Sequence, residues 1–159
     1  PRQPDFETKG VWVTLDTELD YNRYRIQSLR AEFYDETSFP VSNWRQRSKE
    51  LERECLKTAT QEKLWSSPAN EHYFGQSESP GDLGLNGSAS WKMRAFKNML
   101  LDLASIQSSK KLLRISVFDK VMIAGKLITL KDLLLTRKEE QVNYLVKYVT
   151  RKIEEQLTV

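Results

Sequence analysis

Segments typical of β-strands occur early in this chain and again between segments typical of helices. Residues 11–15 are rich in β-branched and aromatic side chains, and residues 111–118 alternate apolar and polar ones. Residues 138–157 repeat apolar side chains at helical spacing and carry charges on the other side. This order of elements predicts a mixed α+β fold.

The length of 159 residues predicts one α+β domain over 1–159, with an N-terminal β-hairpin, central helices, and a small mixed sheet beside a long C-terminal amphipathic helix. The first residue is Pro1, so we expect a domain excised from a larger protein. No apolar run reaches about 18 residues, so we expect no membrane contact. The single cysteine, Cys55, predicts an intracellular location, cytoplasmic or nuclear.

The segment 24–34 fits two structures. Tyr24, Ile26 and Ser28 alternate as in a strand, whereas Ile26, Leu29 and Phe33 have helical spacing. We favour a strand that pairs with 11–15 and completes the hairpin, and the helix stays open as the alternative.

A helix is predicted from Ser42 or Asn43 to about Lys57, with Cys55 on its apolar side. Opposite charges three and four residues apart, between Lys49-Glu50 and Arg53-Glu54, predict ion pairs along its outer side. Further along the chain, short strands are expected at 121–124 and 127–128, and then a helix over 129–135 that begins at Thr129.

Residues 66–90 are rich in glycine, proline and serine and are predicted to form a long loop, with one helical turn at 70–73. A helix follows from Ser90. Glycines next to a helix N-terminus can bring backbone N–H groups close to an anion. The loop residues of this predicted anion site are Gly81, Gly84, Gly87 and Ser88.

Positive charge is concentrated in residues 89–138, which hold 11 Lys and Arg but only three acidic residues. Such a block is typical of an anion-binding face. We therefore predict a nucleic-acid-associated domain that contacts the phosphates of DNA or RNA. The predicted contacts are Lys92, Arg94, Lys97, Lys110, Lys111 and Arg114.

The sequence also offers candidate catalytic residues, with weaker support than the phosphate contacts have. It does not decide whether any reaction is catalysed. Asp16, Glu18 and Asp20 would share one face of an extended segment, with Glu32 opposite them on a partner strand. Such a cluster could bind Mg²⁺, as a metal-dependent hydrolase requires; no other cofactor is indicated. His72, beside Glu71, is a candidate for acid–base chemistry.

Residues 4–14, Pro-Asp-Phe-Glu-Thr-Lys-Gly-Val-Trp-Val-Thr, resemble the stretch that carries the catalytic acids in MutH and Sau3AI-type DNA nucleases. Those nucleases share Pro-Asp-Phe, a gap, and Gly-Val-Glu-Leu-Lys. The resemblance places Asp5 at the first metal-binding aspartate, but Trp12 and Thr14 stand where the required Glu and Lys would be. It implies a nuclease-like domain with a degenerate site that binds or regulates.

Two further expectations concern side chains outside these sites. Most aromatic residues are assigned to the core, with Trp65 and Tyr73 as the exceptions because they flank the loop. The apolar stripe of 138–157 offers an alternative function, a protein-interaction or assembly module, unless it closes the domain's own core.

Overall fold

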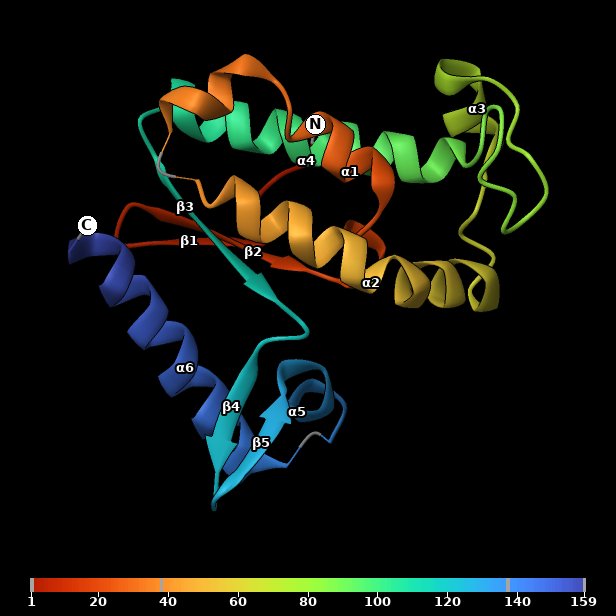
Figure 1. Ribbon diagram of the computed structural model, residues 1–159. Helices are drawn as coiled ribbons and strands as arrows, with labels where there is room; N and C mark the ends of the chain where they lie inside the picture. The colour runs from red at the N-terminus through yellow and green to blue at the C-terminus, as the bar shows by residue number, and fades with distance from the viewer. Residues whose placement is uncertain (1, 38, 137, 159) are drawn as a thin grey trace. The chain divides into compact units, whose positions relative to one another are not determined.

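The computed structural model describes residues 2–37, 39–136 and 138–158 and confirms the α+β class (Figure 1). The chain divides into two compact units. The helical unit comprises Pro1–Arg2 and Thr17–Ala104, and the mixed unit comprises Gln3–Asp16 and Ser105–Val159. Each unit is described by itself. The expectation of one domain over 1–159 stays a prediction.

The mixed unit contains the predicted N-terminal hairpin, but with a different partner strand. β1 (Phe6–Thr8) pairs antiparallel with β2 (Val11–Asp16). The two-residue turn is Lys9-Gly10, with φ of 48° and 76°, the geometry that matches the twist of a hairpin. The predicted pairing of 11–15 with 24–34 is wrong, because β1 takes that position.

β2 also pairs in parallel with β3 (Lys111–Ser116), so the sheet order is β1-β2-β3. A second hairpin, β4 (Lys120–Ile123) and β5 (Lys126–Thr129), precedes α5 (Leu130–Thr136) and α6 (Glu139–Thr158). These elements confirm the predictions for the last third of the chain. Thr129 donates its hydroxyl to Asp132 and accepts the Asp132 N–H, as its place at the helix start predicts.

The core of the mixed unit lies between one face of the three-stranded sheet and the two C-terminal helices. The strands supply Val11, Val13, Leu113 and Ile115, and α5 and α6 supply Leu130, Leu133, Tyr148 and Ile153. Alternation along each strand places these apolar residues on one face. The stripe of α6 therefore closes the core of its own unit through Tyr148 and Ile153, while Val142 and Val146 stay exposed.

The helical unit begins with short elements. These are η1 (Glu18–Asp20), α1 (Arg23–Ser28) and η2 (Glu32–Glu36). The strand favoured for 24–34 is wrong and the helical alternative is closer to the structure. Asn22 explains the difference, because its buried side chain accepts the N–H groups of Tyr24 and Arg25 and so starts a helix.

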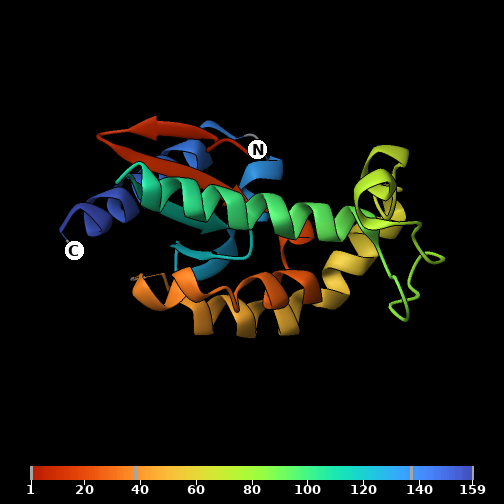
Figure 2. The same cartoon turned by 90° about the horizontal axis from the view of Figure 1, so that it is seen from above.

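Three longer helices complete this unit: α2 (Val41–Gln61), α3 (Pro68–Phe74) and α4 (Ala89–Gln107). α3 and the segment after it lie where α2 ends and α4 begins (Figures 1 and 2). Cys55, Ala59, Trp65 and Trp91 form the core at this end. Cys55 is confirmed as a core residue, and burial raises the pKa of its thiol. Trp65 is also buried, so its expected exposure is wrong, whereas Tyr73 is exposed as expected.

Candidate nucleic-acid interface

The structure does not form the predicted carboxylate cluster. Asp16 ends β2, whereas Glu18 and Asp20 lie in a 3-10 helix, so the segment is not extended and the three do not alternate along a strand. Glu32 lies in η2 instead of on a partner strand. Among residues 2–37, 39–136 and 138–158, no group of three or more His, Cys, Asp or Glu is arranged to hold a metal ion.

Asp20 instead belongs to a buried polar cluster of the helical unit. Arg94 donates to both of its carboxylate oxygens, at 2.8 and 2.9 Å, and Arg2 and Asn98 donate to Oδ1. Burial alone would raise the pKa of Asp20, but the hydrogen bond and charge of Arg94 and the charge of Arg2 hold this pKa well below its usual range. These contacts explain why an ionised Asp20 can be buried in this unit.

Several of the cations predicted to contact phosphate are engaged by acidic residues. Arg94 binds Asp20, Arg114 binds Asp16 at 2.5 Å, and Lys110 binds Glu7 at 2.6 Å. The Arg114 and Asp16 side chains are almost fully buried. In the same segment, Arg137 lies outside the described residues.

The remaining predicted contacts are more accessible. Lys111 donates to the carbonyl of Gln156, and Lys92 donates to Asn86 and lies over the ring of Tyr24. Lys97 is exposed on α4. The predicted basic face therefore offers fewer side chains to a polyanion than its composition implies.

At the predicted anion site, two backbone N–H groups at the start of α4 already donate to the chain's own side chains. Ser88 is buried, accepts the N–H of Trp91 and donates to the carbonyl of Trp65. The N–H of Ala89 donates to Ser77 Oγ at 2.9 Å. Gly87 is required by packing, since a Cβ there would lie 2.1 Å from the Tyr24 hydroxyl and its φ is +59°. Gly81 and Gly84 lie in the exposed part of the loop.

His72 and Glu71 have different neighbours. Both belong to α3, but His72 is exposed and packs edge-on against Tyr73. Glu71 Oε1 instead accepts the Ser66 hydroxyl at 2.5 Å and the Ser77 N–H at 2.9 Å. The helical turn predicted at 70–73 is confirmed and belongs to α3, which shortens the predicted 66–90 loop.

Four cations form a row along α2 in the helical unit. Arg45, Lys49, Arg53 and Lys57 repeat at four-residue intervals, which places them along one side of a helix over about 18 Å. Lys49, Arg53 and Lys57 are exposed, and Arg45 is half-buried. Along the helix the row turns away from the face of the buried residues Ser48, Cys55 and Ala59, so that Arg45 lies nearest to that face and Lys57 lies opposite it.

The ion pairs predicted along this side of α2 are not formed among the described residues. Glu50 accepts a hydrogen bond from Gln46 at 2.8 Å, and Glu52 binds Arg23 of α1. The four cations of the row form no hydrogen bond or ion pair with any other described residue. Like charges at this spacing destabilise an isolated helix by about 0.2–0.5 kcal/mol per pair. The α2 cation row therefore has a stability cost that no described contact offsets.

The residues that carry the nuclease resemblance lie together in the mixed unit. Asp5 Oδ2 accepts the Thr14 hydroxyl at 3.0 Å and the Leu15 N–H at 2.7 Å. Trp12 donates its indole N–H to Glu7 at 2.9 Å. At the positions of the required Glu and Lys, the side chains thus supply an indole and a threonine hydroxyl in place of a carboxylate and an ammonium.

The comparisons with known proteins identify a family. The model of the DUF7255 family, a family of unknown function, matches residues 2–136, and the chain belongs to this family. The match includes the α2 cation row and ends at the last residue of α5. No curated protein matches the chain, and no solved structure matches it. Among the described residues, no helix is long and apolar enough to cross a membrane.

The α2 cation row was missed at the sequence level, although its signal was present. The four-residue repeat of Arg45, Lys49, Arg53 and Lys57 is visible in the sequence, but glutamates at the intervening positions favoured an interpretation as ion pairs. The excess of cations in 89–138 favoured that segment as the interface. Which cations bind carboxylates distant in sequence could be learned only from the fold.

Proposed function

We propose that this protein binds the phosphate backbone of nucleic acid along the outer side of α2. The observation that carries the proposal is the α2 cation row, whose side chains have no acidic partner among the described residues. Phosphate contacts of this kind supply most of the sequence-independent affinity for DNA or RNA. The local resemblance of residues 4–14 to DNA nucleases supports the same class of ligand and implies binding without cleavage.

The test neutralises the row while keeping residues that favour helix. A variant with Arg45→Gln, Lys49→Gln, Arg53→Gln and Lys57→Gln is expected to bind single-stranded oligonucleotides more weakly at low salt. For every phosphate that the variant no longer neutralises, the slope of log affinity against log salt concentration should become shallower by about 0.7. Fluorescence anisotropy of labelled oligo(dC) and oligo(dT) over a salt series measures both quantities.

Two control variants make the same change in net charge elsewhere. The first replaces the exposed lysines Lys9, Lys120, Lys126 and Lys147 by Gln. The second replaces Lys92, Lys97, Lys110 and Lys111 by Gln. If only this second variant lost oligonucleotide binding, the interface would be assigned to the segment 89–138 instead. Absence of oligonucleotide binding by the wild type even at low salt would contradict the proposal. Equal losses in all three variants would contradict the location on α2.

A second candidate function, self-association, is favoured by apolar residues that the core of the mixed unit leaves exposed. Val142 and Val146 lie one turn apart on α6 and are 51% and 56% exposed, and Leu135 of α5 is 69% exposed. Such residues mark a contact surface when they lie together. Sedimentation velocity should show an average mass of the wild type that rises with protein concentration. A Val142→Gln/Val146→Gln variant should have the mass of a monomer at every concentration. A monomer at every concentration would exclude self-association.

A further inference from the structure

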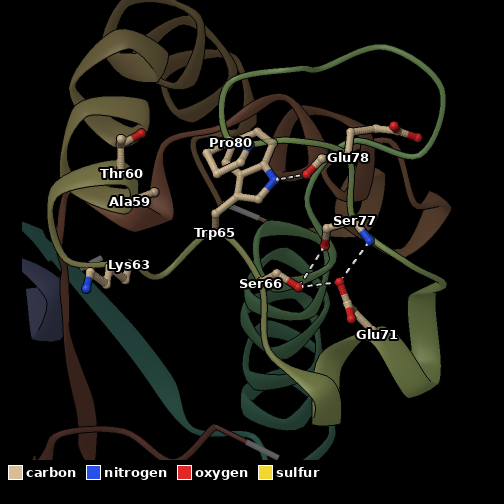
Figure 3. A pocket seen from close by; sticks show the side chains of 9 residues that line it. All are labelled: Ala59, Thr60, Lys63, Trp65, Ser66, Glu71, Ser77, Glu78 and Pro80. Carbon is tan, nitrogen blue, oxygen red and sulfur yellow. Dashed lines mark hydrogen bonds between the residues drawn. The ribbon is translucent and has the colours of Figure 1, made fainter.

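A cavity of about 320 Å³ lies within the helical unit at the C-terminal end of α2. Its volume is at the lower end of the range for small-molecule sites, about 300–1,000 Å³. The lining residues come from the end of α2, the segment after it, α3 and the following loop (Figure 3). They are Ala59, Thr60, Lys63, Trp65, Ser66, Glu71, Ser77, Glu78 and Pro80.

Part of the cavity lining is apolar, and its largest side chain is held in place by hydrogen bonding and ring packing. The apolar lining residues are Ala59, Trp65 and Pro80. The Trp65 indole donates to the carbonyl of Glu78 at 2.8 Å, and its ring packs edge-on against Trp91 with 5.1 Å between the ring centroids. Because the indole is fixed on two sides, the cavity is formed before a ligand arrives, which lowers the cost of binding.

Glu71 gives the cavity a hydrogen-bond acceptor. Its Oε1 already accepts the Ser66 hydroxyl and the Ser77 N–H (Figure 3). The hydrogen bond from Ser66, together with those from Ser77, lowers the pKa of Glu71, so the carboxylate is ionised at neutral pH. No described residue donates to Oε2. A ligand that presents an N–H group at this oxygen therefore gains a charge-assisted hydrogen bond.

Lys63 places a positive charge on the other side of the cavity. Figure 3 shows Lys63 with Ala59 and Thr60 on one side of Trp65, and Glu71 with Ser66 and Ser77 on the other. Lys63 is exposed and has no acidic partner among the described residues. It lies six residues after Lys57, just beyond the last residue of α2.

We propose that this cavity takes one unstacked, amino-bearing base of a single-stranded nucleic acid, with Glu71 accepting from the exocyclic amino group and Lys63 contacting the phosphate. The proposal rests on the proposed function for the identity of its partner. A small planar base fits a preformed cavity with a partly apolar lining, and carboxylates read the amino group of cytosine in other nucleic-acid complexes. The phosphate contact carries no base preference, whereas the contact with Glu71 does.

Cytidine and uridine 5′-monophosphates are the matched probes, because they have the same phosphate and sugar and nearly the same size. They differ at C4, which carries an amino group in cytosine and a carbonyl in uracil, and at N3, which carries a hydrogen only in uracil. Wild type is expected to bind the cytidine nucleotide about tenfold more tightly, the effect of one hydrogen bond to a charged group. Isothermal titration calorimetry gives the two affinities, and chemical shifts of the Ser77 and Glu78 amides report whether the nucleotide occupies this cavity.

Glu71→Gln is the decisive variant. The glutamine carbonyl can still accept from Ser66 and Ser77, which orients its NH₂ to the position of Oε2 and turns an acceptor into a donor. The preference should then reverse toward the uridine nucleotide, whose C4 carbonyl accepts. The Lys63→Ala substitution should weaken the binding of both nucleotides by a similar factor of about three to ten and leave the ratio of the two affinities unchanged.

The outcomes separate this proposal from the proposed function. No binding of either nucleotide at the cavity, or a ratio that Glu71→Gln leaves unchanged, would overturn it even if oligonucleotides bind along α2. Cytidine-nucleotide binding with the expected reversal, but without oligonucleotide binding, would keep the base-recognition site and assign it to free nucleotides, and the proposed function would fail. Preference for oligo(dC) over oligo(dT) that is lost in Glu71→Gln would support both.

Discussion

Replacing Asp102 by alanine is expected to destabilise the helical unit by about 3–5 kcal/mol, because it leaves a buried charge without its partner. The Asp102 side chain is 3% exposed and accepts hydrogen bonds from Arg25 at 2.6 Å and from Tyr34 at 2.5 Å. The Arg25 side chain is itself 1% exposed. Without the carboxylate, its described hydrogen bonds are those to Ser28 and Tyr34. Urea denaturation followed by far-ultraviolet circular dichroism measures the change in the free energy of unfolding.

The matched control is Glu50→Ala in the same unit. Glu50 is exposed and accepts one described hydrogen bond, from Gln46, so its removal should leave the unfolding midpoint almost unchanged. If Asp102→Ala unfolded at the same urea concentration as Glu50→Ala, the cluster of Arg25, Tyr34 and Asp102 would not stabilise the unit. Tyr34 offers a second readout. Burial and the neighbouring Asp102 carboxylate raise the pKa of its hydroxyl, so this pKa should fall when Asp102 is removed.

The same cluster shows why part of the fold could not be predicted from sequence. The window 24–34 has no consistent periodicity, and its helical start depends on the Asn22 side chain. Its position depends on contacts of Arg25 and Tyr34 with Asp102, which is 77 residues from Arg25. α6 and β3, in contrast, were predicted because each has a regular pattern of apolar residues. The pattern identified the elements but not their full burial, since Val142 and Val146 of α6 are exposed and Arg114 of β3 is buried.

β1 was missed for a different reason. Three residues, Phe6–Thr8, are too few for a recognisable alternation, and the first two are exposed. The signal that could have found it is Lys9-Gly10 immediately before the strand at 11–15, since a glycine in a two-residue connection favours a hairpin. A hairpin partner was instead assigned to the stronger apolar segment at 24–34.

Only the chemistry of the candidate interface, contacts between cations and phosphates, could be predicted from the sequence; the residues that are available for these contacts could not. A sequence gives the number of cations, but their availability to a ligand depends on which carboxylates the fold brings close. Arg94 meets Asp20 across 74 residues and Arg114 meets Asp16 across 98 residues. The α2 cation row needs no such long-range information, because its members lie on one helix. Local spacing therefore identifies an exposed charge pattern more reliably than the net charge of a segment.

Arg114→Ala is expected to destabilise the mixed unit by about 3–5 kcal/mol, a second effect of breaking a buried ion pair. Arg114 of β3 donates to Asp16 of β2 at 2.5 Å, and the two side chains are 2% and 0% exposed. Removing the guanidinium leaves the Asp16 carboxylate buried with its strongest neutralising contact gone. Hydrogen exchange of the β2 and β3 amides, together with urea denaturation, should show the loss of protection in these two strands.

A double variant distinguishes this structural role from the predicted phosphate contact of Arg114. Asp16→Leu with Arg114→Met replaces the pair by apolar side chains of similar size, a change that is often neutral or stabilising at buried positions. We expect the double variant to regain most of the stability that Arg114→Ala removes and to bind oligonucleotides with the wild-type salt dependence. Recovery of stability with a shallower salt dependence would assign a phosphate contact to Arg114. Failure to recover stability would mean that the strands need the ion pair itself, because apolar packing did not replace it.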